Sequence, residues 1–280
     1  AAISASRLGL RSAIITNIGN DKHGEDCLTS LKNNKIITDY VTIEKDKNTN
    51  YHYILWYNVD RTILIKHTKF DYKFPELANA SWIYLSSLAE NSLPYHQEIL
   101  KYLDDHPNTK LAFQPGTFQI KFGVEALRNI YKRAEVFFCN AEEAEIILEK
   151  ENLSTWQVDK FLELSKGINA LGPKIVVISD GPNGAYLYQN NGLNDELWHI
   201  PIYPDIAPPL ERTGAGDAFS STITCALALG KTPLEAFAWG PINSMSVVQE
   251  IGAQKGLLTR EKLEEYLKTA PEDYKAKKIN

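Results

Sequence analysis

The 280-residue sequence lacks the features that mark several classes of protein. It contains no apolar run of the roughly 18 residues that a membrane-spanning helix needs, and no signal-peptide pattern opens it. Its net charge is −5, which disfavours an extended basic surface for nucleic acid. The six histidines show no metal-ligand spacing, and the HExxH and Cys–His zinc patterns are absent. With 44% hydrophobic residues, the chain has ample material for one large core.

Cysteine and methionine are also scarce. Cys27, Cys139 and Cys225 are far apart and odd in number, so buried free thiols in a reducing, cytoplasmic setting are expected rather than a redox or metal site. The only methionine is Met245, and the opening "AAISASRLG" is typical of the middle of a helix. We therefore expect the natural N-terminus to lie before Ala1.

Apolar runs and amphipathic segments alternate along most of the chain. Strands are expected at 12–19, 81–88, 110–116, 135–140, 174–181 and 184–189, and helices at 24–34, 94–105, 123–134, 141–150, 156–169, 214–230, 232–250 and 259–268. This alternation predicts a parallel sheet covered by helices on both faces, with ligands beyond the carboxyl ends of the strands. The Lys-rich tail 273–280 is expected to be a frayed end.

Residues 36–70 interrupt this alternation. Two β-rich runs flank a turn-like Asn-Val-Asp at 58–60, which predicts a hairpin. An ordinary edge hairpin and a lid over a ligand both agree with the pattern.

The stretch "ERTGAGDAF" at 211–219 places two glycines and Asp217 at the start of an apolar helix. It is not a P-loop, and Phe219 stands where a dinucleotide fingerprint needs its third glycine. A tight turn would explain the glycines alone. The functional interpretation is an anion cradle made by the backbone amides of 214–217, with Asp217 as a general base.

Two other strand ends carry residues of interest. In "FFCNAEEAE", Asn140 is placed to cap a helix, with Glu143 at the third helical position of a capping box. Capping alone explains both residues, but both could also order Mg²⁺ and its waters near a polyphosphate. In "ISDGPNGAYLY", Ser179, Gly181 and Gly184 fit a tight β connection or a turn against the phosphates and ribose of a nucleotide.

Together these segments resemble the ribokinase-like (PfkB) carbohydrate kinases. "RTGAGDAFSSTITCALALG" is similar to the C-terminal signature of that family, "NAEEAEIIL" to its N-x-x-E motif, and "VVISDGPNGAYLY" to its nucleotide-side strand pair. "ASRLGLRSAIITNIGNDKHG" and "IGAQKGLL" match in the same order. The resemblance implies a three-layer α/β/α sandwich with a mostly parallel central sheet, formed by 1–35 and 71–280, and a small β lid at 36–70.

The resemblance also implies a role for each motif residue. Asp217 would be the base, and the amides of Gly214, Ala215 and Gly216 would stabilise the transferring phosphoryl group. The expected ATP site comprises Asn140, Glu143, Ser179, Gly181, Gly184, Thr213 and Asn243, with Asn140 and Glu143 also binding Mg²⁺ through water.

Two departures from the family pattern are visible. A first strand with a sugar-binding aspartate, followed by a glycine pair and an asparagine, would precede Ala1 and is absent from this sequence. Glu211 and Arg212 replace the usual Asp-Thr, near which a monovalent-cation site often lies, so K⁺ is only a possible ligand. Gln114, at the end of the strand 110–116, is a further candidate to touch the acceptor or the phosphates.

The resulting hypothesis is an ATP-dependent kinase that phosphorylates a hydroxyl of a sugar, sugar derivative or nucleoside, with a homodimer formed through the lid. The alternative is a catalytically silent nucleotide- or sugar-binding protein that keeps the fold. A hydride-transfer enzyme is disfavoured because the dinucleotide fingerprint is missing.

Overall fold

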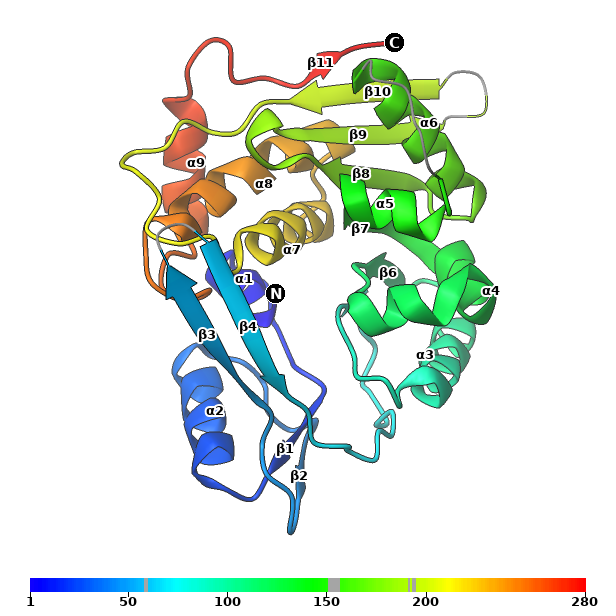
Figure 1. Cartoon of the computed structure of the whole chain (residues 1–280), viewed down its shortest axis with the longest axis vertical. Coiled ribbons are helices and arrows are strands. Elements are labelled where there is room, and N and C mark those ends of the chain that lie inside the picture. Colours follow the sequence, from blue (N-terminus) through cyan, green and yellow to red (C-terminus); the bar gives the residue numbers. More distant parts are fainter. Residues whose placement is uncertain (58–59, 151–156, 191, 193–194) are drawn as a thin grey trace.

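The computed structural model describes residues 1–57, 60–150, 157–190, 192 and 195–280 (Figure 1). The turn predicted at 58–60 therefore falls largely outside the described residues. No helix in these ranges is long and apolar enough to cross a membrane.

A seven-stranded sheet forms the centre of the described structure, in the order β11-β10-β9-β8-β7-β6-β5. Its strands are β5 (Trp82–Leu85), β6 (Lys110–Phe113), β7 (Ala134–Asn140), β8 (Ile175–Ser179), β9 (Ala185–Asn190), β10 (Asp195–Ile200) and β11 (Lys277–Lys278). The strands β5 to β8 are parallel, and β8 to β11 are antiparallel. The sheet is thus mixed rather than mostly parallel, because the links from β8 to β9 and from β9 to β10 are too short for a crossover helix.

Helices cover both faces of this sheet, as the sequence predicts (Figure 1). One face carries α3 (Leu93–Asp105), α4 (Thr117–Arg133), α5 (Ala141–Ile147) and α6 (Gln157–Ala170), and the other carries α1 (Ala2–Arg7), α7 (Ala215–Ala228), α8 (Pro233–Val248) and α9 (Arg260–Lys268). Successive strand residues point to opposite faces. Phe137 therefore packs in the core under α3 to α6, and Phe138 in the core under α7 to α9. The three-layer α/β/α sandwich is confirmed.

The remaining strands form two separate two-stranded sheets among the described residues. The strand β1 (Thr16–Gly19) precedes α2 (Lys22–Asn33) and pairs in parallel with β2 (Val41–Glu44), not with the central sheet. The strands β3 (Tyr51–Tyr57) and β4 (Asp60–Lys66) form the predicted hairpin, to one side of the core (Figure 1).

Side chains hold the hairpin where the chain enters β3 and leaves β4. The Asp21 carboxylate accepts hydrogen bonds from the Thr49 amide (2.9 Å) and the Thr49 hydroxyl (2.6 Å), and also from the Gly24 amide at the start of α2. At the root of the hairpin, the Thr68 amide donates to Asn50 Oδ1 at 2.5 Å. The chain entering β3 is therefore tied to the start of α2, and the two sides of the hairpin are tied to each other.

The Lys-rich tail does not fray, contrary to the prediction. Its strand β11 pairs with β10, and the Ile279 amide donates to the Leu197 carbonyl at 2.9 Å. Tyr274 is buried and donates its hydroxyl proton to the Ala238 carbonyl. This pairing covers the edge of the sheet. The charged composition of the tail does not indicate a strand. Cys139 and Cys225 are buried and free, as expected, whereas Cys27 is exposed.

Candidate active site

The carboxyl ends of the parallel strands bring several of the predicted residues together. Asn140 ends β7, Ser179 ends β8, and the two are aligned in the strand register. Gln114 follows β6, and its backbone amide donates to the Leu85 carbonyl at the end of β5 (2.9 Å). These side chains therefore lie along one edge of the sheet, where ligands bind in open α/β folds.

The helix α7 begins at this edge with the glycines of "GAGD". Gly214 precedes the helix with φ +83°, a left-handed conformation, and an added Cβ would lie 2.4 Å from the Ala253 Cβ. The Ala215 amide donates to the Arg212 carbonyl at 3.3 Å. For the amides of Gly214, Gly216 and Asp217, no partner is found within the described part of the chain. The mouth of the helix thus offers unpaired donors together with a positive dipole end.

Asp217 lies in the first turn of α7 and is exposed. Its Oδ1 accepts a hydrogen bond from Gln114 Nε2 at 3.2 Å. Burial is the main cause of the raised pKa of Glu143, and the charge of Asp217 adds to it, so the two carboxylates interact electrostatically. An exposed carboxylate beside unpaired amides can accept a proton from a group that attacks an anion bound there.

Asn140 and Glu143 form the predicted capping box at the start of α5. The Glu143 amide donates to Asn140 Oδ1 at 2.8 Å, and the Asn140 amide donates to Glu143 Oε2 at 2.9 Å. Burial raises the pKa of Glu143, and the neighbouring charges of Glu142 and Asp217 add to this effect, against the Asn140 hydrogen bond that lowers it. Capping is confirmed, whereas the role of both residues toward Mg²⁺ stays a prediction.

The loop between β8 and β9 is the tight connection that its glycines indicate. The Asp180 amide donates to the Gly184 carbonyl at 2.9 Å, and a Cβ on Gly184 would lie 2.1 Å from the Ile200 carbonyl oxygen. Gly181 instead is exposed, at φ +52°, and an added Cβ would meet no atom within 4 Å. The nucleotide contacts of Ser179, Gly181 and Gly184 stay predictions.

Thr213 and Asn243 differ in what they can offer a ligand. The Thr213 hydroxyl is buried beside the glycines and has no hydrogen-bond partner in the described structure. Asn243 is fully buried, with its Nδ2 donating to Thr222 Oγ1 and its Oδ1 accepting from the Leu258 amide. The side-chain amide of Asn243 joins α8 to the segment before α9. A place for it beside the adenine stays a prediction.

The two residues that replace the usual Asp-Thr differ in burial. Glu211 is 9% exposed, and its Oε1 accepts from the Gly252 amide at 2.5 Å. Arg212 is exposed. The described residues contain no cluster of three or more His, Cys, Asp or Glu side chains that could hold a metal ion by themselves.

Sequence reasoning missed a buried polar network under the strand-end loops. Gln119 Oε1 accepts from the Gly116 amide, while its Nε2 donates to the Ser86 carbonyl and to His96 Nε2. Burial lowers the pKa of His96, so the neutral ring can accept this bond while Nδ1 donates to the Ser92 carbonyl. The network fixes the loops that follow β5 and β6.

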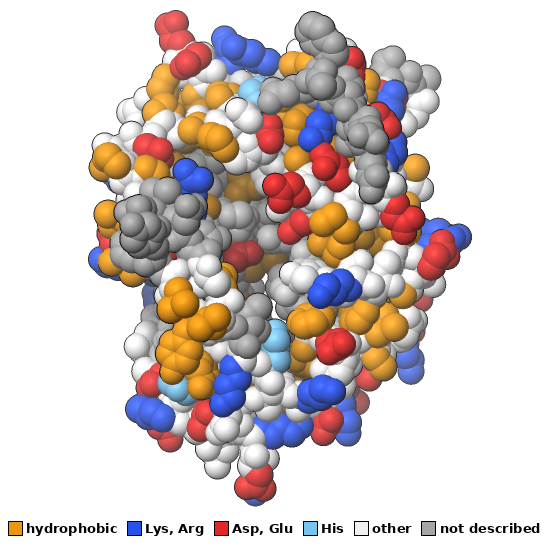
Figure 2. Space-filling view, viewed as in Figure 1, with side chains coloured by type: hydrophobic (Ala, Val, Ile, Leu, Met, Phe, Trp, Pro, Cys, Tyr) orange, Lys and Arg blue, Asp and Glu red, His pale blue; other side chains and the backbone are white. Residues whose placement is uncertain are grey.

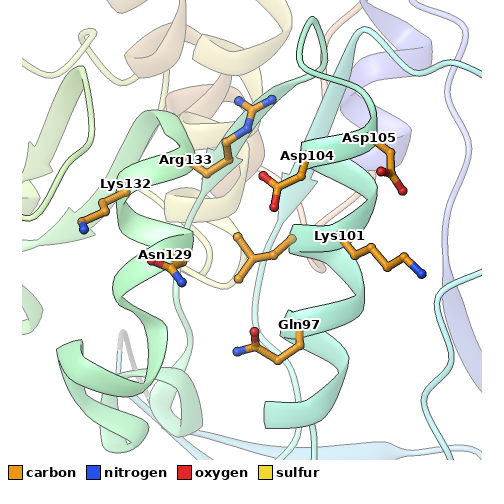
Figure 3. A pocket seen from close by; sticks show the side chains of 8 residues that line it. Gln97, Lys101, Asp104, Asp105, Asn129, Lys132 and Arg133 are labelled. Carbon is orange, nitrogen blue, oxygen red and sulfur yellow. The ribbon is translucent and has the colours of Figure 1, made fainter.

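A polar groove of about 690 Å³ lies elsewhere, between α3 and α4 (Figure 3). It is lined by Gln97, Leu100, Lys101, Asp104, Asp105, Asn129, Lys132 and Arg133. Arg133 immediately precedes β7, whereas Asn140 ends it, so the groove lies toward the amino ends of the strands. The Arg133 guanidinium donates to the carbonyls of Leu103, Pro107 and Thr109, which stabilises the end of α3.

The surface is hollowed between the hairpin and the core, and acidic side chains lie around the hollow (Figure 2). Unpaired amides at the start of a helix, with a carboxylate beside them, suit phosphoryl transfer, which depends on positioning and electrostatic stabilisation. Residues 1–260 match the pfkB family of carbohydrate kinases, and the chain belongs to this family.

Known proteins agree with this assignment. The ribokinase of Bacillus subtilis is 25% identical over 273 residues, covering 95% of this chain and 85% of the relative. Two solved structures share the fold: the nucleoside kinase of Methanocaldococcus jannaschii and a protein of the ribokinase type from E. coli in complex with ATP and Mg²⁺. The first has a TM-score of 0.74 and 19% identity, covering 96% of this chain and 84% of the other. The second has a TM-score of 0.74 and 17% identity, covering 95% and 86%.

Proposed function

We propose that this carbohydrate kinase transfers the γ-phosphoryl group of ATP to a hydroxyl of a small sugar, sugar derivative or nucleoside. The observation that carries the proposal is the exposed Asp217 carboxylate in the first turn of a helix whose glycine amides have no partner in the described structure. The similarity to a ribokinase and to a nucleoside kinase supports the acceptor class.

In this mechanism the acceptor hydroxyl lies between Asp217 and the bound phosphate. Asp217 takes the hydroxyl proton as the oxygen attacks the γ-phosphorus and the bond to the leaving ADP breaks. The free amides of Gly214 and Gly216 stabilise the charge on the transferring group. The Ala215 amide contributes less, because it also donates to the Arg212 carbonyl. The buried, unpartnered hydroxyl of Thr213 fits a phosphate oxygen next to this cradle. Ser179, Gly181 and Gly184 would line the nucleotide side, with Asn243 beside the adenine.

Magnesium fits the charge distribution of the site. Asp217 and Glu143 lie within electrostatic reach of each other, and both would repel a triphosphate. Mg²⁺ neutralises phosphate charge and keeps several waters, so Asn140 and Glu143 could hold it through water without a dedicated ligand cluster. A complex of a similar protein with ATP and Mg²⁺ supports this proposal, whereas K⁺ rests on the family resemblance alone.

We expect Glu143→Gln to raise the Mg²⁺ concentration for half-maximal activity by roughly 10- to 100-fold, the usual cost of losing an outer-shell ligand. Glutamine can still complete the capping box, so the melting temperature should stay close to that of the parent. The measurement is activity against Mg²⁺ at saturating ATP. The control is Glu142→Gln, which removes an exposed neighbouring charge. Equal Mg²⁺ dependence in all three proteins would contradict the role of Glu143.

A screen of sugars and nucleosides with ATP tests the overall proposal. The panel includes D-ribose, D-fructose and adenosine, and phosphate transfer is followed by ADP release and by mass spectrometry of the acceptor. Turnover of at least one alcohol is expected. Calorimetric ATP binding without turnover of any acceptor would favour the silent binding protein instead.

We infer that the segment 36–70 acts as a lid and also forms a homodimer interface. Tyr53 and Leu55 on β3 are 63% and 56% exposed, and Leu64, opposite Tyr53 on β4, is 50% exposed. Figure 2 shows hydrophobic side chains gathered over this hairpin. A two-stranded sheet has unpaired edges as well, and pairing with a second copy would cover both edge and apolar surface.

The lid interface predicts a dimer at micromolar concentration. Tyr53→Lys together with Leu55→Lys should shift the mass measured by light scattering to that of a monomer, because like charges then face each other across the interface. Lysines at Ile146 and Val158, two exposed apolar residues away from the hairpin, serve as the matched control. A monomeric parent protein would contradict the interface.

A further inference from the structure

Gln114 links the candidate base to the interior of the protein. Its Nε2 donates to Asp217 Oδ1 at 3.2 Å, and its Oε1 accepts from the Tyr84 hydroxyl. The backbone of Gln114 is held as well, because its backbone amide donates to the carbonyl of Leu85, the residue after Tyr84. A continuous hydrogen-bonded chain therefore runs from β5 through the end of β6 to the first turn of α7.

The direction of this chain is fixed by the donors and acceptors available. A carboxylate can only accept, so the amide must present its NH₂ end to Asp217 and its oxygen to Tyr84. Burial, together with the charge of Asp217, holds the pKa of the Tyr84 phenol well above its usual range, so Tyr84 keeps the proton that it donates. Without this donor, the Gln114 amide could rotate and turn its oxygen toward the carboxylate.

The geometry points to Gln114, held by Tyr84, as a positioning residue that binds Asp217 Oδ1 and leaves Oδ2 to face the acceptor hydroxyl. No partner for Oδ2 is found among the described residues. The inference rests on the proposed function of Asp217 as the base. It assigns Gln114 a role through Asp217, in place of a direct contact with acceptor or phosphates.

Kinetics of Gln114→Met and Tyr84→Phe test this inference. Methionine keeps the length of glutamine without a donor, and phenylalanine removes a single oxygen atom. Each variant should lower kcat by roughly 10- to 100-fold, because each removes or misorients the Gln114 hydrogen bond to the charged Asp217. KM for ATP and for the acceptor should stay within about twofold, because neither residue binds substrate. The acceptor is D-ribose, or the panel member with the highest turnover.

Two double variants distinguish a positioning role of Gln114 from a packing role. The double variant Tyr84→Phe/Gln114→Met should lose no more activity than Gln114→Met alone, since both act through one chain. Gln114→Met in an Asp217→Asn background should cause no further loss. Gln97→Met, in the groove between α3 and α4, is the matched control. Thermal unfolding identifies any variant that fails to fold, and Tyr84→Phe then remains as the milder test.

The outcomes are distinct. Unchanged kcat in Gln114→Met, or a raised KM with unchanged kcat, would overturn the positioning role, the latter in favour of a substrate contact. A further loss in the Asp217→Asn background would overturn it too. If Asp217→Asn is inactive while Gln114→Met is fully active, this inference alone fails. If Asp217→Asn keeps parental kcat, the proposed function of Asp217 fails as well.

Discussion

Asp217→Asn should lower kcat by roughly 10²- to 10⁴-fold, the usual contribution of a positioned general base. Asparagine keeps the size of the side chain and can still accept the hydrogen bond from Gln114 Nε2, but it cannot take the acceptor proton. Because Asp217 is exposed, its replacement should leave the melting temperature nearly unchanged. KM for ATP should change little, and the measurement is steady-state transfer to the best acceptor of the panel.

Asp104→Asn is the matched control for this experiment, because it removes a carboxylate from the groove between α3 and α4. It should behave as the parent does. Parental turnover in Asp217→Asn would show that the proton leaves by another route, and the mechanism proposed for α7 would then be wrong.

Gly216→Val should lower kcat/KM for ATP by roughly 10²- to 10³-fold, because the side chain would keep the phosphate away from the amides. This is the scale of losing a preorganised donor to a developing oxyanion. An added Cβ at Gly216 meets no protein atom within 4 Å, so the side chain fits the folded protein. The open space beside this glycine is where the phosphate is proposed to lie. Valine also favours a helix more than glycine does, so the protein should melt no earlier than the parent.

Two companion variants sharpen this prediction. Gly216→Ala should give a smaller loss of ATP use, because only one carbon enters the space. Gly214→Ala should lower the melting temperature too, because Gly214 has φ +83° and its Cβ would meet Ala253. Normal ATP kinetics in Gly216→Val would place the phosphate elsewhere.

The sequence predicts those parts of the fold and site that depend on local patterns. The alternation of strands and helices places Asn140 and Ser179 at strand ends, and the glycines with Asp217 mark the start of α7. Tyr84 and Gln119 could not be found in this way, because their roles come from contacts with residues distant along the chain. The edge strand β11 was missed for the same reason: its two lysines gain their structure from pairing with β10.

The base of the hairpin has a consequence for how such an enzyme can diversify. Asp21, Thr49 and Asn50 fasten the hairpin independently of the glycines and Asp217 on α7. Substitutions along β3 and β4 can therefore accumulate without disturbing the start of α7, where the phosphate is proposed to bind. Under the proposed function, one alcohol could replace another through changes in a ribbon of two strands, while the residues proposed to bind the nucleotide stay the same.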